Sequence, residues 1–79
     1  MFYEIPTLKA VDADRTDIPA SGLVDPVRVG TGTVHAAELK DGTGQASFCD
    51  CVHGVFKEFK APTWIAAYFE AMAYAETVA

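Results

Sequence analysis

Two cysteines and two histidines are the residues of this chain best suited to metal or thiol chemistry. Cys49 and Cys51 are separated by a single residue, and His35 stands earlier in the chain. If these segments form a hairpin with a turn of three residues, 41–43, His35 faces Cys49. Two thiolates and an imidazole, which are ligands that zinc prefers, then converge. If the turn holds two residues, His35 faces Phe48 instead, because a one-residue slip exchanges the two faces of a strand.

Three arguments weigh against chemistry at these residues. His53 lies too far along a straight strand to join Cys49, and structural zinc sites use paired knuckles rather than a single C-x-C. The negative charge of Asp50, between the two cysteines, disfavours the thiolate form that a cysteine nucleophile needs. We therefore predict free thiols, no catalytic residue, no metal and no cofactor. A zinc- or thiol-dependent protein built on Cys49, Cys51 and His35 is the alternative.

The acidic residues are the second group that could bind a ligand. Asp12, Asp14 and Asp17 invite a calcium interpretation because hard cations take several oxygen ligands. Their spacing fails the twelve-residue calcium loop, whose sixth position would be Asp17 rather than glycine and whose twelfth would be Leu23 rather than glutamate. We predict instead that acidic and aromatic side chains contact a partner. The predicted partner-binding residues are Asp12, Asp14, Asp17, Glu70, Tyr74 and Glu76.

The charge balance indicates what kind of partner is plausible. Six Lys and Arg against eleven Asp and Glu give a formal net charge of −5 in 79 residues, so the field of the protein repels phosphate backbones. We predict no direct nucleic-acid binding and a protein partner with a basic surface. The first residues lack a signal-peptide pattern, and no apolar run approaches the ~20 residues of a membrane helix. We therefore expect a cytoplasmic protein without membrane contact.

Four segments must position these side chains. Residues 2–11 suit one short or bent edge strand, and 12–26 are rich in turn formers and predict a long surface loop. Residues 27–39 and 45–59 favour the two strands of a long hairpin around a glycine-bearing turn, and 62–78 predict a helix. The sequence predicts one α+β domain, 1–79. Its antiparallel sheet of three to four strands is built on the long hairpin, with the C-terminal helix packed on one face.

The residue pattern of the helix predicts which side covers the sheet. The core-facing arc is expected to consist of Trp64, Ile65, Tyr68, Phe69, Met72 and Ala75. Tyr74 and the small residues Ala66, Ala67 and Ala73 are expected to face away from the sheet. They form either an interface or an alanine-rich exposed face, which helix propensity alone would permit. The helix carries no Lys or Arg, which is unusual for a solvated surface helix.

The second strand of the hairpin is partly apolar on both sides. Phe48, Val52 and Phe56 share one side, and Phe56 and Phe69 are the expected core anchors. Because an antiparallel sheet with a solvated face normally alternates more cleanly, we expect the second face to be covered. The N-terminal segment or a second copy of the protein would provide that cover.

In size, acidity, alanine-rich composition and lack of a catalytic motif, the chain resembles the small phage-encoded inhibitors known as anti-CRISPR proteins. The resemblance rests on these general features and carries over no residue. It implies a phage protein that docks on a CRISPR effector in the host cytoplasm, often on its nucleic-acid or PAM-reading surface, and blocks target DNA. We thus expect a small acidic binding protein that inhibits a macromolecular partner by covering its surface. A homo-oligomeric structural or assembly protein, for instance a homodimer, is the alternative.

Overall fold

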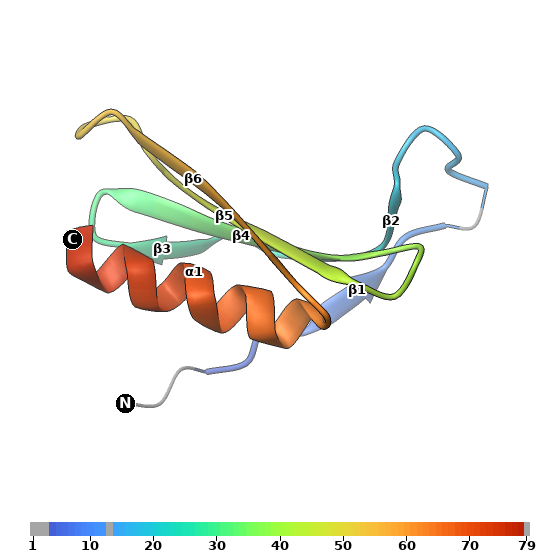
Figure 1. Cartoon of the computed structure of the whole chain (residues 1–79). Coiled ribbons are helices and arrows are strands. Elements are labelled where there is room, and N and C mark those ends of the chain that lie inside the picture. The colour runs from blue at the N-terminus through green and yellow to red at the C-terminus, as the bar shows by residue number, and fades with distance from the viewer. Residues whose placement is uncertain (1–3, 13, 79) are drawn as a thin grey trace.

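The chain folds into an antiparallel sheet of six strands with one C-terminal helix across one face (Figure 1). The computed structural model describes residues 4–12 and 14–78. The elements are β1 (Leu8–Ala10), β2 (Ala20–Val24), β3 (Val27–Val29), β4 (Gly32–Leu39), β5 (Gly44–Asp50), β6 (Val55–Ala61) and α1 (Trp64–Val78). The predicted α+β class is confirmed, with six strands rather than three to four. Within the described residues no helix is long and apolar enough to span a membrane.

The two long strands predicted for the hairpin are each divided by a tight turn. The first splits into β3 and β4 at Gly30 and Thr31, and the second splits into β5 and β6 around residues 51–54. Gly30 and Gly54 adopt φ angles of +60° and +66°. Side chains rarely tolerate this left-handed conformation. Gly30 and Gly54 therefore reverse the chain within the segments that were each predicted to be one strand.

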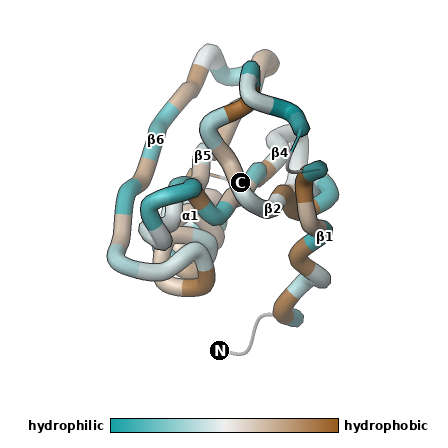
Figure 2. Tube along the Cα trace, turned by 90° about the vertical axis from the view of Figure 1, so that its right-hand side faces the viewer, coloured by the Kyte–Doolittle hydropathy of each residue, from teal (hydrophilic) through white to brown (hydrophobic). Residues whose placement is uncertain are grey.

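The N-terminal third contributes two further strands. The loop predicted over 12–26 contains β2. Of the edge strand predicted over 2–11, only Leu8–Ala10 form a strand, β1, among the described residues 4–11, and residues 2 and 3 lie outside the described residues. The spatial order of the strands is β1-β2-β4-β5-β6, and β3 pairs with the beginning of β4. The strands β1 and β6 consequently lie at opposite margins of the molecule (Figure 2).

The β4–β5 turn sets a register that neither of the sequence interpretations anticipated. The Leu39 amide donates to the Thr43 carbonyl at 2.8 Å, so the turn holds residues 40–42. The Asp41 carboxylate accepts hydrogen bonds from the backbone amide and the hydroxyl of Thr43, at 2.9 and 2.6 Å. As a result His35 lies opposite Ser47, and neither Cys49 nor Phe48.

A stripe of alanines brings α1 close to the sheet. Ala67, Ala71 and Ala75 are fully buried with Tyr68, and they pack against buried side chains of β4 and β5. Since successive members of the stripe are four residues apart, they lie one above another on one helix face. At Gly44 an added Cβ would lie 2.2 Å from the Thr63 carbonyl oxygen, so the start of the helix requires glycine there.

The predicted core-facing arc of the helix is therefore partly wrong. Tyr68 and Ala75 face the sheet as expected, but Phe69 is exposed and Ala67 is buried rather than turned outward. The physical reason is that small side chains allow a closer approach between helix and sheet than bulky ones. Phe48 of β5 fills the space this approach leaves, and none of its surface is exposed.

Phe56 is not the core anchor that the sequence predicted. It is 65% exposed and lies in β6, whereas Phe48 of β5 is completely buried. Phe48→Ala should therefore lower the free energy of unfolding by about 3–5 kcal/mol, because it removes a buried ring and leaves a cavity. Phe56→Ala should cost less than about 1 kcal/mol. Urea unfolding of both variants measures the difference, and equal losses would contradict this assignment of the core.

Candidate functional site

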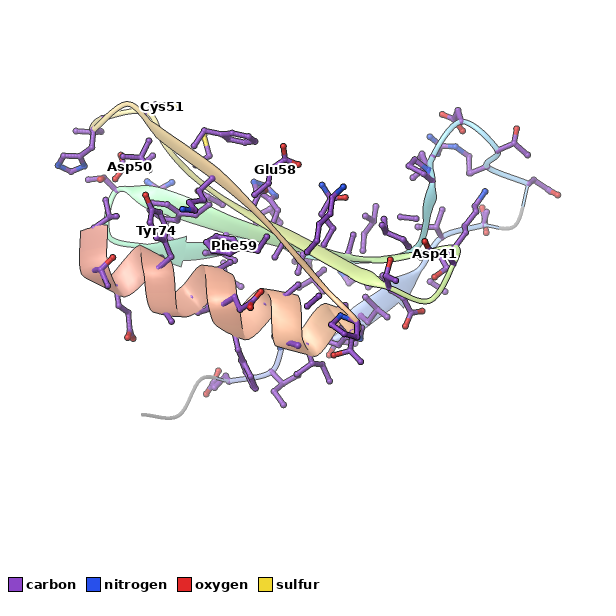
Figure 3. All side chains as sticks on the ribbon, viewed as in Figure 1. Asp41, Asp50, Cys51, Glu58, Phe59 and Tyr74 are labelled. Carbon is purple, nitrogen blue, oxygen red and sulfur yellow. The ribbon has the colours of Figure 1, made fainter. Side chains whose placement is uncertain are left out.

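The face of the sheet opposite α1 has no covering element among the described residues. In an antiparallel sheet, paired residues point to the same side, so the register defines which side chains occupy this open face. The open face consists of Lys9, Leu23, Arg28, Thr33, His35, Ala37, Gln45, Ser47, Cys49, Phe56, Glu58 and Lys60. Figure 3 shows Glu58 pointing away from α1, while Phe59 and Tyr74 lie between the sheet and the helix.

The N-terminal segment does not cover this face where the structure describes it. The Tyr68 hydroxyl of α1 donates to the Glu4 carbonyl at 3.2 Å, which ties the segment to the helix side of the molecule. Further along, β1 pairs edge to edge with β2. The expectation that the N-terminal segment covers the second face is thus wrong for residues 4–12, and cover by a second copy stays a prediction.

An open hollow of about 280 Å³ lies in the middle of the open face. Small side chains, Ala37 and Ser47, line its centre. Leu23 and Phe56, which are 42% and 65% exposed, line it from different strands. Exposed apolar side chains around a concavity are characteristic of a binding surface rather than of a solvated sheet face.

The polar side chains beside the hollow include a histidine, a serine and a glutamate on adjacent strands. His35 and Ser47 are cross-strand neighbours, but among the described residues no hydrogen bond joins their side chains. Glu58 lies beyond Ser47, where its carboxylate accepts a hydrogen bond from the Gln45 amide at 2.7 Å. A catalytic triad needs the carboxylate to orient the imidazole, and the imidazole to contact the hydroxyl. The order of the three groups across the strands does not provide this arrangement.

The open face carries basic side chains at its margins. Three of the six Lys and Arg residues belong to it. Lys9 forms an exposed ion pair with Asp25 at 2.7 Å. Within the described part of the chain no ion pair engages Arg28 or Lys60. The local charge of the face therefore differs in sign from the net charge of −5 of the chain.

The acidic residues predicted to bind a partner lie elsewhere, in two separate groups. Asp12, Asp14 and Asp17 are exposed in the loop before β2, and Glu70 and Glu76 are exposed on α1. The loop lies at one end of the molecule and the C-terminus of α1 at the other (Figure 1). The structure does not bring the two groups into one patch.

Within the loop, one acidic side chain has a basic partner. The Arg15 guanidinium donates to the Asp17 carboxylate at 3.1 and 3.2 Å and lowers the pKa of that carboxyl. Because the pair is exposed, its effect on folding is small. The loop therefore acts mainly as a solvated acidic surface.

Tyr74 occupies a different position from the one its sequence context indicated. Its ring lies 6.0 Å from the ring of Phe48 and 5.7 Å from that of Phe59, and the Lys57 ammonium lies 5.2 Å from its centroid. The prediction that Tyr74 faces away from the sheet is therefore wrong. Its contact with a partner stays a prediction.

The two cysteines are close to each other but are not joined to His35. Cys49 belongs to the open face, Cys51 is exposed in the β5–β6 turn, and both are free thiols. A hydrogen bond with the Cys51 side chain, together with partial desolvation, raises the pKa of the Cys49 thiol. A raised pKa disfavours the thiolate that nucleophilic or metal chemistry needs. Among the described residues, no three His, Cys, Asp or Glu side chains are placed to share a metal ion.

Sequence reasoning missed the structural role of Asp50, which is 1% exposed. One carboxylate oxygen accepts from the backbone amides of Val52 and His53, at 3.0 and 3.1 Å. The other accepts from the Thr31 hydroxyl and from Nδ1 of His53, both at 2.8 Å. Asp50 thus joins the β3–β4 turn to the β5–β6 turn. The signal in the sequence was an Asp before a glycine-ended turn, where its side chain caps backbone amides.

Comparison with protein-family models, with curated proteins and with solved structures finds no match for this chain.

The hydrogen bonds of Asp50 predict a pH dependence of stability. The His53 side chain, followed by the Thr31 hydroxyl, lowers the pKa of Asp50 from 3.8 to about 2. The unfolded chain therefore binds a proton at higher pH than the folded chain does. The resulting stabilisation is complete above pH ~4 and is lost as the pH falls towards 2.

Thermal melts between pH 2 and pH 6 test this linkage on wild type and Asp50→Asn. The stability of wild type should fall across the acid range more steeply than that of Asp50→Asn, which should be the less stable variant at neutral pH. Asp41→Asn serves as a comparison: hydrogen bonds from Thr43 also lower the pKa of this exposed turn aspartate, but by less than for Asp50, so its substitution should change the pH dependence less than Asp50→Asn does. Parallel curves for wild type and Asp50→Asn would contradict the assignment.

Proposed function

We propose that this protein is a non-enzymatic binding protein that inhibits a macromolecular partner by covering its surface with the open face. The observation that supports this most directly is the open hollow, lined by the exposed side chains of Leu23 and Phe56 on a face without cover among the described residues. Burying such side chains against a partner provides the hydrophobic core that a stable interface needs.

The chemistry of the face suits a protein ligand. The hollow offers apolar walls together with the hydrogen-bonding groups of His35, Ser47 and Gln45. An apolar side chain that protrudes from the partner would fill it, and a carboxylate or carbonyl nearby would pair with Arg28 or Lys60. Contact of this kind combines an apolar centre with a polar rim, as is usual in specific interfaces.

The acidic residues are proposed to attract the partner electrostatically before contact is made. Five acidic residues lie outside the open face: Asp12, Asp14, Asp17, Glu70 and Glu76. In this proposal they contribute to the electrostatic field of the protein and do not touch the partner. A net charge of −5 attracts a partner whose overall surface is basic and raises the rate of encounter. Proteins that handle nucleic acid present such surfaces.

The resemblance to anti-CRISPR proteins gives the proposal its specific form. A CRISPR effector holds nucleic acid in a positively charged channel, which an acidic protein of this size would approach readily. In this form of the proposal, the open face with Arg28 and Lys60 docks on a less basic part of the effector beside the channel, and the acidic groups lie towards the channel. The bound inhibitor then blocks the access of target DNA, and no bond in the partner is made or broken.

Substitutions on the open face test the contact directly. Phe56→Ala and Leu23→Ala should each weaken binding at least ~5-fold, because a residue at the centre of an interface contributes more than ~1 kcal/mol. Val52→Ala is the matched control, since Val52 is 72% exposed but lies in the β5–β6 turn outside the face.

The readouts are affinity for purified CRISPR effector complexes and inhibition of their binding to target DNA. Loss of both in Phe56→Ala, with Val52→Ala unchanged, supports the proposal. If the two variants behave alike, the open face is not the contact surface. If target-DNA binding is unaffected in effectors of every type, the anti-CRISPR form of the proposal fails.

Charge reversal tests the contribution of the field. Replacing Asp12, Asp14 and Asp17 by lysine should slow association several-fold at low salt, and the difference should disappear at ~0.5 M salt, where charges are screened within a few Å. The dissociation rate should change little, because these residues lie outside the contact. Reversal of Glu70 and Glu76 tests the second acidic group in the same way. Association rates independent of both reversals would exclude electrostatic attraction.

A further inference from the structure

The free backbone edge of β6 offers a second binding surface, whose donors and acceptors point sideways out of the sheet, whereas the open face binds through its side chains. It is the last strand in the sheet, pairs only with β5 in the described structure, and extends over seven residues at the margin of the molecule (Figures 1 and 2). The other edge, β1, has three residues. An unpaired strand edge presents a row of backbone donors and acceptors that readily pair with another strand.

We propose that two copies of this chain pair through β6, antiparallel across a twofold axis, so that their sheets join into one. A twofold axis perpendicular to the sheet keeps both open faces on the same side. Because side chains alternate along a strand, this symmetry requires one residue of β6 to pair with itself at the axis. The identity of that residue fixes every other pair.

The charges on β6 select one register. An axis through Lys57, Glu58 or Lys60 would place two like charges directly opposite each other, which is destabilising. An axis through Phe56 would align only three residues of each strand, 55–57, before the strand ends. An axis through Phe59 avoids both problems and aligns five residues, 57–61.

In the register centred on Phe59, the side chains of the two copies also complement each other. Glu58 of each copy faces Lys60 of the other, so two opposite-charge pairs form on the joined open face. Glu58 already accepts a hydrogen bond from Gln45 at 2.7 Å, which holds its carboxylate in place. On the helix side the two Phe59 rings meet beside Tyr74, whose ring lies 5.7 Å from that of Phe59.

Such a dimer goes beyond the proposed function and does not depend on it. Joining the sheets through β6 places two hollows on one continuous face. A partner with two equivalent sites, or one with an elongated surface, would then be held by both copies at once. Pairing uses the backbone edge of residues 57–61 in β6, whereas Leu23 and Phe56 line the hollow through their side chains; Glu58 belongs to both surfaces.

Charge reversal at the two paired positions provides a decisive test by analytical ultracentrifugation. In Glu58→Lys, lysines face lysines twice across the axis, and in Lys60→Glu, glutamates face glutamates twice. Each variant alone should raise the dimer dissociation constant at least tenfold. An equimolar mixture of the two should restore association, because every lysine then faces a glutamate. Lys9→Glu, on the opposite edge, should leave the dimer unchanged.

The results that support the dimer can be distinguished from those that overturn it. Wild type is expected to be dimeric within the micromolar to millimolar range, and circular dichroism establishes that each variant is folded. Wild type that stays monomeric throughout this range overturns the proposal. So does a dimer that neither reversal weakens, or a pair of monomeric variants that fail to associate when mixed. Failure of the Phe56→Ala binding test would leave this result untouched, so the two proposals can be rejected independently.

Discussion

The close contact of α1 with β4 and β5 is the constraint on which the rest of the structure depends. A stripe of alanines, Ala67, Ala71 and Ala75, allows the helix to lie near the sheet, and Gly44 leaves room for the chain at Thr63 where the helix begins. Phe48 fills the remaining space between them. A helix with larger residues on this face would be displaced outward and would leave a cavity beside Phe48, which is costly in a domain with a single small core.

One helix of fifteen residues covers only one face of a six-stranded sheet, and the open face follows from this geometry. The alternation of β5 and β6 places Phe48 and Phe59 against the helix and leaves Cys49 and Phe56 on the other side. An exposed phenylalanine beside a hollow is unusual on a solvated sheet face, and the proposed binding function rests on this composition. The same strand, β6, ends the sheet and presents the pairing edge.

The sequence allowed the fold class and the helix to be predicted, but not the number of strands or the open face. Val- and Phe-rich segments identified the strands, yet the reversals at Gly30 and Gly54 read equally well as bends, because a glycine with positive φ is compatible with both. The position of His35 depended on the turn, in which Asp41 accepts hydrogen bonds from Thr43. The observed partner of His35, Ser47, lies one residue from Phe48 and two from Cys49, the two partners considered from the sequence. The buried face of the helix was predicted wrongly because Phe69 is more hydrophobic than Ala67. The short distance between helix and sheet leaves room for the small Ala67 side chain but not for a phenylalanine ring.

Local order on the open face depends on a second interaction, the hydrogen bonds of the buried Asp50. By joining Thr31 in one turn to His53 in the next, this carboxylate fixes the ends of β4, β5 and β6 relative to one another. Cys49 and Phe56 lie opposite each other directly beside these ends, so the position of the Phe56 ring depends on the turn that Asp50 holds. A binding surface on a sheet face gains affinity when its exposed side chains are held in place before the partner arrives. Asp50 therefore links the stability of the fold to the order of the open face, although it does not line the hollow.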